Sequence, residues 1–142
     1  MQKSSDHPHV RIAILLILCF CLVFMGCERE SRPAKIGKLE YTVVAGSDIP
    51  QELKKLINER KKKSFELTFS ENACLYVTKG YGKQKSGGYS IKINEFYQAK
   101  DTLVLDTELF GPKKDQEVSD QPSYPYIVLK TEYREEPVTF YP

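Results

Sequence analysis

The chain has 142 residues, with 21 lysines and arginines against 19 aspartates and glutamates and a formal net charge of +2 at pH 7. This length suits a single domain, and the balanced charge excludes a strong electrostatic field directed at nucleic acid. Four cysteines and two histidines are present, and their positions narrow the possible chemistry further.

Residues 1–26 have the layout of a secretory signal. A polar, basic start precedes the uninterrupted apolar run Ile12–Met25. As a helix at about 1.5 Å per residue this run would measure roughly 21 Å, which is short of the ~30 Å hydrocarbon core of a bilayer. It ends in Gly26–Cys27, which resembles a bacterial lipobox although Phe24 replaces the commoner leucine. We expect cleavage before Cys27 and lipidation of its sulfur, with a plain secreted protein or an uncleaved anchor as the alternatives.

Removal of the signal restricts catalysis. It takes away both histidines and two of the four cysteines, and lipidation occupies Cys27, so Cys74 would be the one free thiol. Serine and cysteine hydrolases need an imidazole, and zinc sites usually draw on one. We therefore expect no catalytic residue, metal site, cofactor or disulfide in the domain, and no enzymatic activity. Two-carboxylate chemistry of the glycosidase type stays open, and its scattered candidates are Asp101, Asp106, Glu108, Asp115 and Asp120.

A tether and then a domain are predicted after the cysteine. Residues 27–38 are charged and include proline and glycine, which is typical of a flexible linker. Several acyl chains hold a protein on a bilayer far more firmly than one, so the domain, residues 39–142, would stay at the extracytoplasmic face of the cell membrane. Its first segment, Leu39–Ala45, is rich in β-branched and aromatic residues and predicts a strand.

One amphipathic helix follows, ending near Lys62. Asp48 suits its N-cap and Pro50 its first turn. Apolar residues then recur at helical spacing, and we expect the buried set to be Ile49, Leu53, Leu56 and Ile57. The basic run Glu59–Ser64 at the end of this helix is interpreted as a solvated face, because cations favour the carbonyl end of a helix. Contact with anionic lipid or an acidic partner is the alternative.

From residue 64 onward the pattern is that of strands. Six short apolar runs alternate with turn residues, and these are Phe65–Phe69, Cys74–Thr78, Tyr89–Ile93, Thr102–Phe110, Tyr126–Lys130 and Val138–Tyr141. With the first strand they make about seven, which favours a mainly β fold, an antiparallel β-sandwich or partly open barrel with the helix packed on it. Alternation predicts Tyr89, Ile91, Ile93, Leu103, Leu105 and Leu109 on buried faces and Ser90, Lys92, Asp106 and Glu108 on wet ones.

Two adjacent glycines, Gly87 and Gly88, stand before the third of these runs. A chain reversal there requires backbone angles that residues with a Cβ avoid. A hairpin accounts for one glycine, whereas two followed by Tyr89 indicate a loop whose bare backbone another chain can approach. The preceding residues fit neither a dinucleotide-binding nor a phosphate-binding loop.

The sequence "SGGYSIKI" is similar to the "TGGYS" signature of the PrcB-like family, lipoproteins named for a subunit that associates with and stabilises a secreted serine protease complex. The resemblance extends over Phe65–Tyr141 and includes "PSYPYIVLKT", Pro122–Thr131. It implies an extracytoplasmic binding lipoprotein that associates with and stabilises a protein partner, with a secreted protease as the expected partner. The implied partner-binding residues, whose role is either recognition or architecture, are Ser86, Gly87, Gly88, Tyr89, Ser90, Pro125 and Tyr126.

Two other functions stay open. A Gly-Tyr loop on a β-sandwich also resembles the chagasin-like protease inhibitors, although their other two loop elements are missing from this sequence. The second alternative is an envelope lipoprotein with a structural or small-ligand role and no protease partner.

Overall fold

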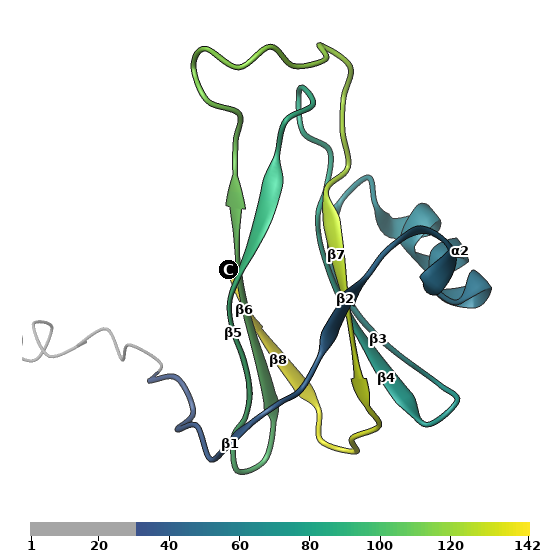
Figure 1. Ribbon diagram of the computed structural model, residues 1–142, viewed down its shortest axis with the longest axis vertical. Coiled ribbons are helices and arrows are strands. Elements are labelled where there is room, and N and C mark those ends of the chain that lie inside the picture. The colour runs from purple at the N-terminus through teal and green to yellow at the C-terminus, as the bar shows by residue number, and fades with distance from the viewer. Residues whose placement is uncertain (1–30) are drawn as a thin grey trace, which may run out of the picture. The chain divides into compact units, whose positions relative to one another are not determined.

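The computed structural model describes residues 31–142, of which Pro33–Pro142 form one compact unit. The expected signal peptide and Cys27 lie outside the described residues. Within residues 31–142 there are eight strands, a 3₁₀ turn at Gly46–Asp48 and one α-helix (Figure 1). In chain order they are β1 Gly37–Lys38, β2 Thr42–Val44, α2 Gln51–Arg60, β3 Ser64–Glu71, β4 Cys74–Tyr81, β5 Ser90–Gln98, β6 Leu103–Phe110, β7 Tyr126–Glu132 and β8 Val138–Tyr141.

The strands form two four-stranded sheets, ordered β1-β5-β6-β8 and β2-β7-β4-β3. Neighbouring strands are antiparallel except for β6 and β8, which run parallel. The mainly β fold with one helix is therefore confirmed, and the sheets do not close into a barrel. The parallel pair departs from the all-antiparallel prediction. The short connection Tyr133–Pro137 crosses from β7 to the other sheet, so that Val138 starts β8 beside Leu103, the first residue of β6.

Apolar residues from both sheets meet in a single layer between them. Leu75 and Val77 of β4 and Leu129 of β7 pack with Phe96 of β5 and Leu105 of β6. These side chains are at most 5% exposed, and each fully buried large apolar side chain contributes about 1.5–3 kcal/mol. This shared core is what holds the two sheets face to face.

Helix α2 covers the outer face of the β2-β7-β4-β3 sheet. Leu53 and Ile57 point from the helix onto Tyr76 of β4 and Val128 of β7. The helix begins after Pro50 and ends at Arg60, slightly shorter than predicted, and no side chain caps its start. The expected N-cap was therefore wrong, because Asp48 belongs to the 3₁₀ turn before the helix. Of the residues expected to be buried, Ile49, Leu53 and Ile57 are, whereas Leu56 is only half-buried.

The segment predicted as the first strand divides between the sheets. Gly37–Lys38 pairs with the end of β5, and Thr42–Val44 pairs with β7. Leu39 crosses between them and enters the core at 2% exposure. The Tyr97 hydroxyl also donates a hydrogen bond of 2.8 Å to the carbonyl of Pro33. The compact unit thus begins at Pro33, inside the segment interpreted as tether.

The other six predicted runs correspond to strands β3 to β8, except that Tyr89 and Thr102 lie one residue before β5 and β6. Alternation is as expected along the start of β5, where Ile91 and Ile93 are half-buried and Lys92 is exposed. Asp106 is a correction: it lies on the outer face of β6 but is only 4% exposed. A β-bulge in β5 brings the Asn94 amide to 3.3 Å from the Asp106 carboxylate and shields it.

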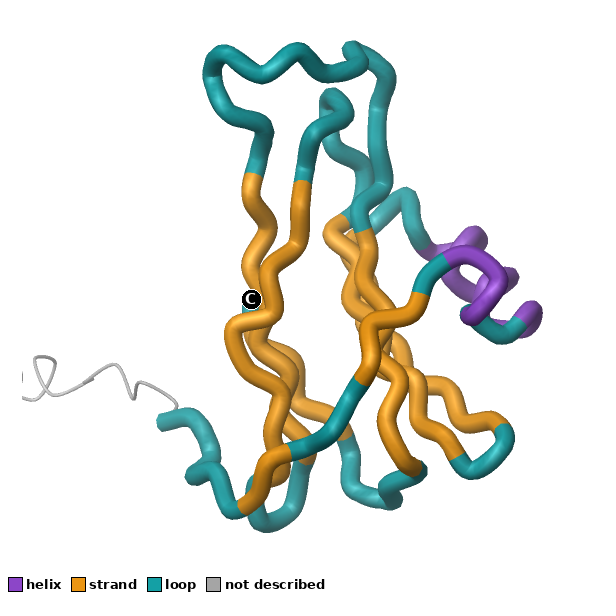
Figure 2. The backbone as a smooth tube through the Cα atoms, viewed as in Figure 1, coloured by secondary structure: helices purple, strands orange, loops and turns teal. Residues whose placement is uncertain are grey.

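The connections of Pro33–Pro142 gather at two opposite ends of the strands (Figure 2). We call "apex" the end with the β4–β5 loop, Gly82–Tyr89, and the β6–β7 loop, Gly111–Pro125. The "base" is the other end, with β1 and the turns Asn72–Ala73 and Ala99–Thr102. The chain enters the unit at the base, and the "SGGYS" signature lies at the apex.

Candidate functional site

The two apex loops are joined along their length by hydrogen bonds. Gln84 and Ser123 form an isolated antiparallel bridge, with N–H to carbonyl distances of 2.8 and 3.2 Å. The Gly87 N–H donates to the Ser119 carbonyl at 2.8 Å, and the Ser123 hydroxyl donates to the Ser86 carbonyl at 2.6 Å. Backbone groups of the signature are thus satisfied by the β6–β7 loop. The apex is one double-layered platform rather than two free loops.

The two signature glycines have different structural roles. Gly88 has φ +80°, and a Cβ built there would lie 2.4 Å from Val118 Cγ1 and 3.0 Å from Pro112 Cβ. Gly87 has no positive φ, and the nearest contacts of its Cβ, with Ser119, would be an ordinary 3.5 Å. Gly88 is therefore required both by its backbone conformation and by close packing. A close approach to the glycine backbone was predicted for another chain. In the structure, the β6–β7 loop of the same chain makes this approach.

Tyr89 and Ser90 connect the platform to the sheet. Tyr89 is half-buried, and its ring lies beside Gly111. A Cβ built on Gly111 would be 3.5 Å from the ring, an ordinary contact distance. Ser90 is exposed and begins β5, opposite Phe110 at the end of β6. Tyr89 thus fixes the β4–β5 loop against the start of the β6–β7 loop.

The second predicted element, Pro125 and Tyr126, lies at the same end of the molecule. The Pro125 carbonyl accepts a hydrogen bond of 3.0 Å from the Tyr81 N–H at the end of β4. No peptide bond among residues 31–142 is cis, so the bond before Pro125 is trans. Tyr126 is 40% exposed, and Phe110 beside the signature is 43% exposed. Both predicted elements therefore meet at the apex, with two large aromatic side chains open to solvent.

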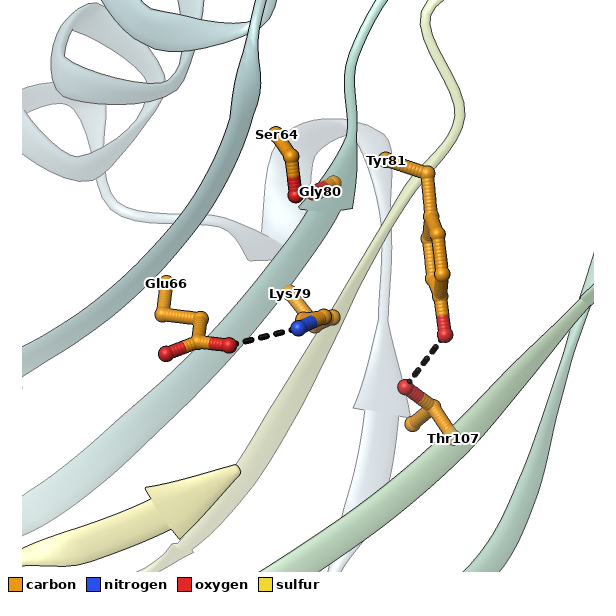
Figure 3. A network of polar contacts seen from close by, with 6 residues as sticks. All are labelled: Ser64, Glu66, Lys79, Gly80, Tyr81 and Thr107. Atoms are coloured by element: carbon orange, nitrogen blue, oxygen red, sulfur yellow. Dashed lines mark hydrogen bonds and ion pairs between the residues drawn. The ribbon is translucent and has the colours of Figure 1, made fainter. Parts of the chain in front are cut away.

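A polar network lies below the apex, between the sheets (Figure 3). The Lys79 ammonium is 2.5 Å from a Glu66 carboxylate oxygen and 6.0 Å from the centre of the Phe140 ring of β8. Lys79 is only 6% exposed, whereas the Glu66 side chain is 45% exposed. The Tyr81 hydroxyl meets the Thr107 hydroxyl at 2.8 Å, which ties β4 to β6 across the sandwich. This network holds the two sheets together where the apex loops leave them.

Sequence reasoning missed the residues that support the signature. Val118, Ser119 and Ser123 come from a polar loop that has no motif of its own. The one available signal was length, since loops of this size without secondary structure are uncommon and often functional.

The groups that metal binding or two-carboxylate chemistry would use can be placed within residues 31–142. Within residues 31–142, no three His, Cys, Asp or Glu side chains come together as a metal site would require. Over the same residues, no helix has both the length and the hydrophobicity to cross a membrane. The carboxylate candidates are distributed over three parts of the domain: Asp101 in the base turn, Asp106 and Glu108 on β6, and Asp115 and Asp120 in the β6–β7 loop.

Fold and site together define a β-sandwich domain that carries a rigid platform of two loops. Residues 75–132 match the family model described as PrcB C-terminal, so the predicted PrcB-like family is confirmed. The matched segment runs from β4 to β7 and contains both predicted elements and the β6–β7 loop. The family suggests a subunit that associates with a protease complex. No curated protein and no solved structure gave a significant match.

Proposed function

We propose that this protein is a lipid-anchored extracytoplasmic subunit that associates with a secreted protease and stabilises it through the apex. The observation that carries the proposal is the placement of both signature elements on the apex platform, within the segment that matches the family. A preorganised surface loses little conformational entropy on binding. Phe110 and Tyr126 supply exposed aromatic side chains of the kind that dominate interface energies.

The point where the chain enters the domain bears on how a lipid anchor at Cys27 would orient it. Gly37 pairs with Gln98, at the end of β5 farthest from the signature. The nine residues of β5 span roughly 27 Å, in eight steps of about 3.4 Å each. An anchor on the N-terminal side of Pro33 would therefore leave the apex free to meet another protein.

A paired pull-down tests the apex. Phe110→Ala combined with Tyr126→Ala removes both exposed apex rings, and Tyr133→Ala removes a ring that is 50% exposed beyond the end of β7, at the base. We expect the apex variant to recover at least tenfold less protease from solubilised membranes, since loss of hot-spot side chains costs about 2 kcal/mol or more. The base variant should recover as much as the unaltered chain. Equal recovery by all three would contradict the proposal.

Two further measurements test the anchor and the stabilising role. Replacing Cys27 by alanine should move the protein from the membrane fraction to the soluble or uncleaved pool, because the acyl chains would be lost.

Deleting the protein should shorten the lifetime of its protease, measured by pulse-chase. A protease whose lifetime does not change would argue for the inhibitor or structural alternative.

A further inference from the structure

A cluster of lysines forms on the apex from segments far apart in the sequence. The "lysine patch" comprises Lys61, Lys62, Lys63, Lys83 and Lys85, from the end of α2 and from the β4–β5 loop. The two segments touch, because the Lys83 N–H donates to the Lys62 carbonyl at 3.3 Å. A Cβ on Gly82 would lie 2.9 Å from the backbone of Lys63 and Ser64. The basic run at the helix end thus gains two lysines that sequence spacing does not reveal.

The two segments of the patch hold five lysines and no interleaved carboxylate. Among residues 31–142, no ion pair involves any of these five lysines. No acidic residue occurs in residues 60–65 or 82–89. The carbonyl end of α2 offsets only about half an elementary charge. The patch therefore concentrates five positive charges, which the near-neutral net charge of the chain conceals.

The patch adjoins the platform assigned above to partner binding. Lys85 directly precedes the signature. The Lys61 ammonium lies 5.7 Å from the centre of the Tyr124 ring and 2.9 Å from the Asn58 side-chain oxygen. Tyr124 precedes the second predicted element, so this contact orients one lysine beside it. The patch thus adjoins the first signature element through Lys85 and the second through the contact of Lys61 with Tyr124.

We infer that the lysine patch binds a carboxylate-rich segment of the protein partner, and this inference rests on the proposed function. Lysine ammonium groups recognise anions as point charges. A membrane fits less well, because the patch lies at the far end of β5 from the point where the chain enters. That separation of roughly 27 Å is several times the ~8 Å Debye length at physiological ionic strength. A bilayer at the base would not attract the patch.

A binding assay with defined probes tests the inference on the purified full-length chain. The probe is a fluorescein-labelled decapeptide alternating Glu with Ser, and the reference peptide has Gln in place of Glu. The patch variant carries Lys→Gln at positions 62, 63, 83 and 85, whose side chains are exposed and unpaired. The control variant carries the same change at Lys54, Lys55, Lys92 and Lys100 and has the same net charge.

We expect the Glu peptide to bind the unaltered chain and the control variant alike. The patch variant should bind at least about tenfold more weakly at ~0.15 M salt, since it loses four exposed charge contacts, and the salt dependence should flatten. If the unaltered chain bound the Glu peptide no more tightly than the Gln peptide, the inference would be overturned. An equal loss of affinity for the Glu peptide in the patch and control variants would also overturn it.

Vesicles of equal parts phosphatidylglycerol and phosphatidylcholine form the second arm. Since every variant keeps the apolar run Ile12–Met25, only a difference between variants is informative. Vesicle binding that does not differ among the three chains supports a protein segment as the occupant. A fall confined to the patch variant would overturn that assignment in favour of anionic lipid.

A water-soluble carbodiimide separates this inference from the proposed function in intact cells, because it joins an amine to a contacting carboxylate without a spacer. We expect bonds from patch lysines to Asp or Glu of the captured protease, lost in the patch variant. Protease capture that does not change in the patch variant contradicts the inference alone. Peptide binding through the patch, with no protease captured by any chain, contradicts the proposed function alone.

Discussion

The two ends of the sandwich are built differently. At the base, β3 and β4 are joined by Asn72–Ala73 alone, and β5 and β6 by Ala99–Thr102. At the apex, the corresponding connections are the eight residues Gly82–Tyr89 and the fifteen residues Gly111–Pro125. Short turns suffice to reverse a strand. The apex therefore holds far more chain than closure of the sheets requires, and that extra chain is hydrogen-bonded into one platform.

This contrast separates the end of the domain that only connects strands from the end that carries the candidate binding residues. The base reverses the strands and receives the N-terminal segment. The apex carries the signature residues, the exposed aromatic rings and the lysine patch. Loops held on a rigid scaffold are the usual place for binding residues. Changes at the apex should therefore separate into those that break the platform and those that leave it standing, whereas changes at the base should affect stability alone.

The largest effect is expected at Gly88. Gly88→Ala forces a Cβ into a left-handed conformation and into contact with Val118 and Pro112, which together cost about 2–4 kcal/mol. Gly87→Ala meets only ordinary contacts and should change stability by less than about 0.5 kcal/mol. Denaturant unfolding of the two purified variants measures the difference.

The same pair separates architecture from recognition. Gly87→Ala that keeps its stability but no longer recovers protease would show that the loop backbone is itself a contact surface. Equal stability of the two variants would contradict the different roles assigned to the two glycines.

An intermediate effect is expected in the charged pair below the apex. Glu66→Ala leaves the 6%-exposed Lys79 without its carboxylate and should destabilise the domain by about 1–3 kcal/mol. Lys79→Met removes the buried charge itself and leaves a half-exposed Glu66 that water can solvate, so it should cost less than about 1 kcal/mol. Thermal unfolding of both variants tests this asymmetry, and a larger loss in Lys79→Met would contradict it.

The smallest effect is expected at the base. Asn72 and Ala73 have φ of 51° and 58°, and Asn-Gly is the favoured pair for such a two-residue hairpin turn. Ala73→Gly should therefore stabilise the domain by about 0.5–1 kcal/mol. Unfolding of the variant measures the gain, and protease recovery should stay unchanged. Altered recovery would show that the base also takes part in binding.

The sequence predicted the sheets better than the connections between them. Short runs of apolar and β-favouring residues between turn residues identified β3 to β8, because strands buried on one or both faces need such side chains. The division of Leu39–Ala45 between two sheets could not be predicted from the sequence pattern. The path of this segment depends on the place where Leu39 enters the core. Burial of Asp106 was equally hidden, because it depends on the bulge at Asn94 in the neighbouring strand.

The site was predictable where it is local in the sequence. Gly87 and Gly88 indicated a special loop, and the structure shows that only Gly88 requires glycine. The packing of Val118 on that glycine could not be predicted, because a polar loop has no periodicity from which to infer its path. The approach of Lys83 to the end of α2 depends on the register of β3 against β4, which no local pattern contains.

Site-specific photocrosslinking in intact cells tests the central claim, that the apex is the binding surface, most directly. A benzophenone amino acid replaces either Tyr126 at the apex or Tyr133 at the base, two exposed aromatic positions where the fold tolerates a large ring. The account predicts a covalent adduct with a secreted protease from position 126 and none from position 133. An adduct from position 133 alone, or from neither position, would contradict it.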